Sequence, residues 1–210
     1  MSTFKAIIKY SVIAVGIILL IYIGITIYFA YSFASAFDMP YSRKDLVDNF
    51  NKRQQAIVEL KIYFNRIVPK SKQVEIEFES DNKLFRFGVS PLDTVTGNVI
   101  YPIFLEWDLK TNSAKVDSVI ATLGWTQETL KNLKEKLDSA NCIRIESGEP
   151  VTIGFKRSGM GMYSYKLFTN PIPDSLKGHY NDSCRFIYYN ERLVLEYGGG
   201  AIGGQCFPVE

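Results

Sequence analysis

The sequence is poor in the side chains that most enzymes and metal proteins use. Its 210 residues include one histidine, His179, and three cysteines, none of which forms a CxxC pair. Zinc and thiol-redox sites usually take paired Cys or His residues, so both kinds of site are disfavoured. The chain also lacks the GxSxG nucleophile elbow and the GxxxxGK[S/T] phosphate loop. We therefore predict no catalytic residues, no metal site and no cofactor.

An excess of charge of one sign is also absent. The chain has 24 Lys and Arg against 22 Asp and Glu, and Lys5 and Lys9 account for the difference. Residues 38–210 are therefore electrically balanced. Nucleic-acid binding needs a concentrated basic surface that displaces counterions, and anionic lipid headgroups attract the same kind of surface. The composition thus argues against nucleic acid as a partner and against headgroup binding by this part of the chain.

The chain begins with a long apolar run that carries no charge. From Tyr10 to Phe37 there are 28 residues, rich in Ile, Val, Leu, Tyr and Phe, without any Asp, Glu, Lys or Arg. About 20 apolar residues at ~1.5 Å rise per residue cover the ~30 Å hydrocarbon core of a bilayer, so this run is long enough to span one as a helix. The sequence predicts a short tail at 1–9, a transmembrane signal anchor at 10–37 and one domain at 38–210.

The same segment has some features of a cleavable signal peptide. Lys5 and Lys9 precede the apolar run, and small residues at 34–36 resemble a cleavage site, but the apolar region of a signal peptide is shorter, at about 7–15 residues. An uncleaved anchor is therefore favoured over cleavage after Ala36. Large domains translocate largely regardless of flanking charge. We expect the domain outside the cytoplasm, in the periplasm of a bacterial inner membrane, where the bacterial source rests on composition alone.

Residues 38–210 are predicted to form one α+β domain with a mainly antiparallel sheet and two helices. One helix starts at Ser42 and ends before Pro69, and a second starts at Thr126. Alternating apolar and polar residues predict strands at 74–78, 84–89, 99–107, 115–123, 142–146, 151–157, 162–168, 185–189 and 193–197. A helix followed by several strands thus occurs twice, although the residues of the two parts do not match.

The three cysteines can form one disulfide in an oxidising compartment. Cys184 precedes the last predicted hairpin and Cys206 follows it, so we predict a Cys184–Cys206 bond. Cys142 paired with Cys206, or three unpaired thiols, are the alternatives.

Glutamates alternate with apolar residues along the first predicted strand, at Glu75, Glu77 and Glu79. We interpret them as a solvated face rather than as a cation site, because calcium sites usually draw their oxygens from loops.

The end of the chain is rich in glycine and aromatic residues. Five glycines lie just after the last predicted strand: Gly198, Gly199, Gly200, Gly203 and Gly204. They indicate either a closely packed tail or a backbone that a partner can approach, because glycine has no side chain and is costly to order. No helix follows them, which disfavours phosphate binding. We take these glycines, with Tyr163 and Tyr165 from the aromatic-rich last third, as candidate contact residues for a ligand or partner.

These observations favour a membrane-tethered, non-enzymatic binding domain displayed outside the cytoplasm, for example an accessory or immunity-like envelope protein. Its expected partner is another envelope protein. Two alternatives stay open. The first is a thiol-dependent hydrolase that uses a cysteine with His179. The second is a structural subunit of a membrane complex. The sequence leaves the ligand and the oligomeric state open.

Overall fold

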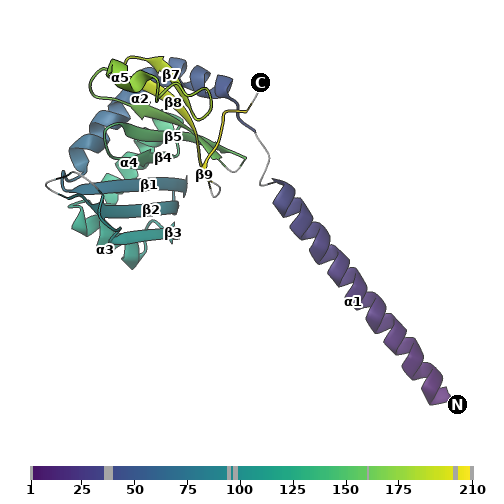
Figure 1. Cartoon of the computed structure of the whole chain (residues 1–210). Coiled ribbons are helices and arrows are strands. Elements are labelled where there is room, and N and C mark those ends of the chain that lie inside the picture. Colours follow the sequence, from purple (N-terminus) through teal and green to yellow (C-terminus); the bar gives the residue numbers. More distant parts are fainter. Residues whose placement is uncertain are drawn as a thin grey trace. The chain divides into compact units, whose positions relative to one another are not determined.

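The computed structural model describes residues 2–35, 40–93, 96, 99–159, 161–200 and 203–208 (Figure 1). The chain divides into two compact units, Met1–Met39 and Pro40–Glu210. We describe each unit by itself.

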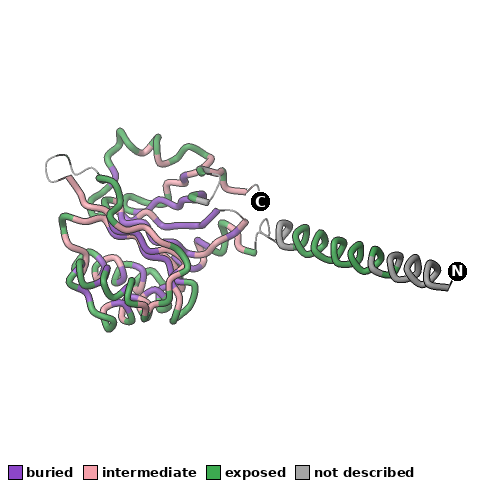
Figure 2. Tube along the Cα trace, turned by 90° about the horizontal axis from the view of Figure 1, so that it is seen from below, coloured by how far each residue is buried: buried purple, intermediate pink, exposed green. Residues whose placement is uncertain are grey.

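The first unit contains one helix, α1 (Ser2–Ser35), which is 34 residues long. Its described side chains, at residue 13 and residues 15–31, are all exposed (Figure 2). Within the described residues, no helix has the length and apolar character needed to cross a membrane. The structure therefore does not support the transmembrane part of the fold prediction. Residues 36 and 37 of the predicted span lie outside the described residues.

The second unit begins with α2 (Arg43–Ile67), as predicted. Ser42 accepts a hydrogen bond from the backbone N–H of Asp45, and the Asp45 carboxylate accepts one from the Ser42 N–H in return. This reciprocal capping satisfies two backbone donors that the start of a helix would otherwise leave open. The helix ends two residues before Pro69, which cannot donate to the helical ladder.

Nine strands of the described chain form one antiparallel sheet. They are β1 (Lys72–Ser80), β2 (Lys83–Pro91), β3 (Phe104–Lys110), β4 (Arg144–Glu146), β5 (Val151–Ser158), β6 (Gly161–Leu167), β7 (Phe186–Asn190), β8 (Leu193–Gly200) and β9 (Gly203–Gly204). Their order is β3-β2-β1-β4-β5-β6-β8-β7, and β9 pairs with β8. The predicted α+β class with an antiparallel sheet is confirmed, and the hairpin to β9 was not predicted.

Three further helices lie in this unit: α3 (Ala114–Thr122), α4 (Gln127–Ser139) and the short α5 (Asp174–Lys177). The helix predicted from Thr126 is confirmed as α4, which Thr126 caps. The strand predicted at 115–123 is wrong, because this segment is α3. Its buried residues Val116, Val119 and Ile120 follow helical rather than alternating spacing, and Ser113 caps its first turn.

The third predicted strand is shorter than expected. β3 starts at Phe104 rather than at Val99, and Pro102 lies in the irregular segment before it. A proline has no N–H for the ladder, so regular pairing begins only after it.

The repeated order of helix and strands that the sequence showed is visible in the topology. One part is α2 followed by β1, β2 and β3, and the other is α4 followed by β4, β5 and β6. The first strands of the two parts pair with each other through three residue pairs, with Ile76 opposite Ile145 at the centre. The two helices pack against each other on one face of the sheet (Figure 1).

The helices cover an apolar core that includes a buried polar cluster. The Tyr165 hydroxyl donates a 2.7 Å hydrogen bond to the Leu46 carbonyl and accepts a 3.1 Å bond from Asn49. The Asn49 amide also donates to the Ala140 carbonyl at 3.1 Å. These bonds join α2, the end of α4 and β6. They give the buried polar groups of Asn49 and Tyr165 hydrogen-bond partners.

The opposite face of the central sheet carries ion pairs. Arg157 donates two hydrogen bonds to the Glu77 carboxylate, at 2.7 and 2.8 Å. Glu75 lies 2.9 Å from Arg144 and 3.2 Å from Arg86. Burial raises the pKa of the Glu75 carboxyl, and these two arginines oppose the rise. The interpretation of this face as solvated is therefore wrong for Glu77, which is only 2% exposed.

Replacing Glu77 tests how much the buried ion pair stabilises the sheet. Glu77→Gln leaves the Arg157 guanidinium beside a neutral amide. We expect the free energy of unfolding to fall by about 2 kcal/mol, less than for a fully enclosed pair because Arg157 is partly exposed. Chemical denaturation followed by the fluorescence of buried Trp125 measures the change.

Glu79→Gln is the matched control on the same strand, because Glu79 pairs with Lys83 at the exposed surface. We expect it to change the unfolding free energy by less than about 0.5 kcal/mol. Equal losses in the two variants would contradict the special role of Glu77.

Candidate functional site

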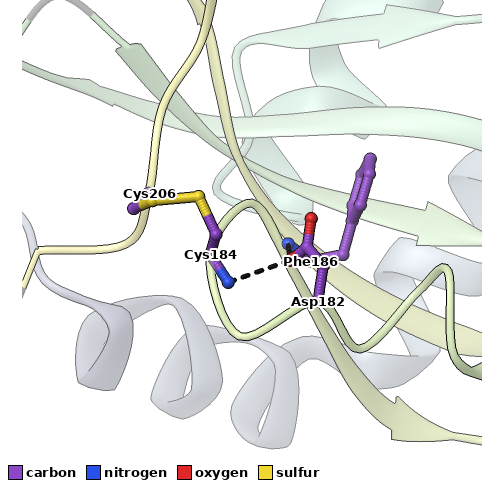
Figure 3. Close-up of a disulfide and its surroundings, with 4 residues drawn as sticks. All are labelled: Asp182, Cys184, Phe186 and Cys206. Carbon is purple, nitrogen blue, oxygen red and sulfur yellow. Dashed lines mark hydrogen bonds between the residues drawn. A yellow bond between two sulfur atoms is a disulfide. The ribbon is translucent and has the colours of Figure 1, made fainter.

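The predicted disulfide is present. Cys184 and Cys206 are bonded across a sequence separation of 22 residues (Figure 3). Beside the bond, one oxygen of Asp182 accepts 2.9 Å hydrogen bonds from the backbone N–H groups of Cys184 and Phe186. The disulfide fixes the C-terminal segment to the start of β7. Phe207 continues this attachment, because its N–H donates to the Cys184 carbonyl at 2.8 Å.

Cys142 is the free cysteine, and it is buried. Burial raises the pKa of its thiol to about 12, so it stays protonated at neutral pH. His179 contacts the rings of Tyr180 and Phe186. A thiol hydrolase needs an accessible thiolate beside a base. Two of the three cysteines are oxidised and the third is buried, so the structure brings no such pair together.

The described residues contain no cluster of three or more His, Cys, Asp or Glu side chains that could hold a metal ion.

The glycine segment has a conformational reason for its composition. Gly198, Gly199 and Gly203 have φ angles of 140°, 73° and 81°, which side-chain-bearing residues rarely adopt. They form the hairpin in which Gly198 pairs with Gly204 and Gly200 pairs with Gly203. Gly198 is buried, whereas Gly199 and Gly203 are exposed. Among the glycines whose exposure is described, Gly199 and Gly203 offer accessible backbone, and contact with a partner there stays a prediction.

The two candidate tyrosines lie in the core. Tyr163 and Tyr165 are 1% and 0% exposed. The ring of Tyr163 packs on Tyr197 at 4.7 Å and on Phe207 at 5.7 Å between centroids, so it holds the C-terminal segment in place. Neither ring therefore reaches the surface.

The most exposed apolar surface of the second unit lies elsewhere, before and within β3. Nine large hydrophobic side chains are exposed in the described part of residues 40–208, and five of them lie within nine residues of chain. We call these five the β3 edge patch: Val99, Ile100, Tyr101, Ile103 and Trp107, with exposed fractions between 46% and 91%. Clustered apolar exposure of this kind marks interaction surfaces more often than isolated exposed residues do.

Hydrogen bonds hold the patch against the end of β2. The Ile100 N–H donates to the Pro91 carbonyl at 2.9 Å, and the Ile103 N–H donates to the Val89 carbonyl at 3.0 Å. Trp107 is partly fixed by the Arg86 guanidinium, which lies 5.7 Å from its ring centroid. The backbone is therefore positioned while the apolar side chains stay accessible.

The patch adjoins the terminal strand of the sheet, which α3 also contacts. β3 is the first strand in the order, so one of its sides has no paired strand among the described residues (Figure 1). Backbone N–H and C=O groups on such a side can pair with an added strand. Charged side chains also line β3, since Glu106 pairs with Lys115 and Asp108 pairs with Lys83. Charges on an edge strand oppose indiscriminate pairing, which favours a specific partner.

The sequence predicts a strand at 99–107, in which Pro102 indicates an edge or a bulge, but it does not identify the apolar side chains of this segment as an exposed patch.

Comparisons of the chain with protein-family models, with curated proteins and with solved structures found no match.

Thiol counting tests the placement of the cysteines. We expect no thiol of the folded, oxidised chain to react with a maleimide, because two cysteines are bonded and Cys142 is buried with a raised pKa. Reduction should expose two thiols, and denaturation after reduction should expose three. Mass spectrometry of the labelled chain measures each count. A thiol that reacts before reduction would contradict this placement.

Proposed function

We propose that this chain is a membrane-tethered, non-enzymatic interaction domain, displayed outside the cytoplasm, that binds another envelope protein through the β3 edge patch. The observation that carries the proposal is the patch itself. It places five exposed hydrophobic side chains beside an open strand edge, in a unit whose other apolar residues are mostly buried.

The tether part of the proposal rests on the sequence, since no membrane-crossing helix is found among the described residues. α1 is one uninterrupted helix of 34 residues, and from Tyr10 onward it contains no charged residue. At ~1.5 Å rise per residue, the 28 uncharged residues from Tyr10 to Phe37 would exceed the ~30 Å thickness of the hydrocarbon core as a helix. Tyr10 at one end, with Tyr28 and Tyr31 toward the other, suits the two interfacial regions of a bilayer.

The external location is supported by the disulfide. Stable structural disulfides persist in the periplasm and outside cells, whereas the cytosol keeps thiols reduced. The Cys184–Cys206 bond fixes the C-terminal segment to the domain. In the chain-entropy model, closing a loop of this size stabilises the fold by about 3 kcal/mol.

Strand addition is the binding mode that this geometry favours. An extended segment of the partner would pair with the free side of β3, and its apolar side chains would lie against Tyr101, Ile103 and Trp107. Backbone pairing supplies part of the affinity in this mode, and side-chain contacts supply the specificity. Large aromatic anchors such as Trp and Tyr commonly dominate interface energies.

The tether can be tested by fractionation. We expect the full chain to stay with membranes after alkaline carbonate washing, and a chain that lacks residues 2–37 to be released. In intact spheroplasts, an impermeant reductant followed by an impermeant maleimide should label Cys184 and Cys206 without lysis. Labelling that requires lysis would place the domain in the cytoplasm and contradict the proposal.

The patch can be tested with Tyr101→Ser combined with Ile103→Asn. These side chains are exposed, so the variant should keep the wild-type midpoint of chemical denaturation. We expect its affinity for the partner to fall about 30-fold or more, because each removed anchor contributes about 1–2 kcal/mol. Native electrophoresis of mild-detergent extracts should show the wild-type chain in a larger complex and the variant outside it.

Leu176→Ser is the control, because Leu176 is an exposed apolar residue of α5, far along the chain from the patch. It should leave the complex intact. A complex that survives in the patch variant, or disappears equally in the control, would exclude the β3 edge as the binding surface.

A further inference from the structure

A groove lies beside α2, away from the β3 edge patch. It has a volume of about 740 Å³ and runs between the exposed side of α2 and the segments that follow β6 and join β7 to β8. The strand order places β7 and β8 at the opposite end of the sheet from β3. We call this space the α2 groove. Its volume is in the range of about 300–1,000 Å³ that is typical of small-molecule sites.

The base of the α2 groove is apolar. Phe50, Leu167 and Leu193 line it and are nearly completely buried. Val58 and Ile62, one helical turn apart on α2, form an apolar wall and are 38% and 57% exposed. They are the exposed large hydrophobic side chains of α2, whose other apolar residues turn toward the core.

Two cations face the same groove. Lys61 and Arg192 both line it, and they are close enough for the positive charge of Arg192 to repel the Lys61 ammonium. Partial burial lowers the pKa of the Lys61 ammonium, Glu149 opposes this effect, and Arg192 adds to it.

Two acids lie near these cations, and one of them, Glu149, attracts the Lys61 ammonium more strongly than Arg192 repels it. Both carboxylate oxygens of Glu149 accept hydrogen bonds from Thr169, one from its backbone N–H at 2.7 Å and one from its hydroxyl at 2.6 Å. Glu191 is the acid in the groove lining, and its negative charge helps to raise the pKa of the Lys177 ammonium. Among the described residues, neither Lys61 nor Arg192 has a carboxylate within ion-pair distance. A ligand carboxylate placed between them could therefore pair with both cations.

We propose that the α2 groove binds a single-chain amphiphile with a carboxylate head, such as a long-chain fatty acid. The hydrocarbon chain lies along Phe50, Val58 and Ile62, and the carboxylate lies between Lys61 and Arg192. From Phe50 to Asn65, both of which line the groove, α2 extends about 22 Å at ~1.5 Å per residue, which accommodates an extended chain. This site does not depend on the proposed partner-binding function, since it shares no residue with the β3 edge patch.

Photolabelling tests this proposal on the full chain in lipid nanodiscs. The probe is myristic acid that carries a diazirine on its chain. After irradiation, peptide mapping by mass spectrometry locates the adducts. We expect adducts in residues 54–65, 167–169 and 190–193, and we expect unlabelled myristate to compete while myristyl alcohol does not.

Charge reversal supplies the decisive comparison. Lys61→Glu with Arg192→Glu should reduce labelling of the groove about tenfold, because a hydrogen bond to a charged group is replaced by repulsion. Lys61→Arg should keep the labelling. Lys110→Glu changes the same charge at an exposed position of β3 and should have no effect.

The proposal would be overturned by adducts confined to α1, by equal competition from the alcohol, or by equal loss of labelling in the Lys110 control. Circular dichroism is used to check that the double variant is folded. Lys61→Gln keeps most of the packing of the side chain and provides a milder second variant. Partial loss in Lys61→Gln supports the proposal, and unchanged labelling in that variant and in the folded double variant contradicts it.

Discussion

The fold depends on the antiparallel pairing of β1 with β4. This pairing joins two parts, each a helix followed by three strands, into one sheet. The seam is short, with three residue pairs, and it is supported on both faces. On one face, Ile76 and Ile145 pack beneath the paired helices α2 and α4. On the other face, Arg144 bridges the seam to Glu75. Because the first strands of the two parts meet, β3 is left at one end of the sheet and β7 at the other. The β3 edge patch and the α2 groove therefore lie at opposite ends of one continuous structure.

Much of this fold could be predicted where local pattern and tertiary packing agree. The caps at Ser42 and Thr126, the alternation in β1 and the Cys184–Cys206 bond were all readable from the sequence. The segment that became α3 was misread, because its β-branched residues favour strands while their burial follows helical spacing. The seam between β1 and β4 was not predictable, since strand order depends on long-range pairing that no local pattern encodes.

The candidate surfaces were harder to predict than the elements, because exposure depends on where a strand lies in the sheet. Apolar residues at 99–107 suit a buried strand equally well, but four of the five patch residues precede β3 and the fifth lies on this terminal strand, where they stay accessible. Conversely, the sequence suggested Tyr163 and Tyr165 as contact residues, yet α2 covers Tyr165 and the C-terminal Phe207 packs on Tyr163. The near-neutral charge of the domain gives the exposed apolar side chains a larger role in recognition, because long-range electrostatic attraction contributes little.

The measurement that most directly tests the account is photocrosslinking from within the β3 edge patch in intact cells. A photoreactive phenylalanine analogue replaces Ile103 in the full chain, and the same analogue at Leu176 serves as the comparison. We expect irradiation to join the chain through position 103, and not through 176, to one envelope protein. If neither position forms a crosslink, or if both crosslink alike to many proteins, the patch is not a specific docking surface and the central claim fails.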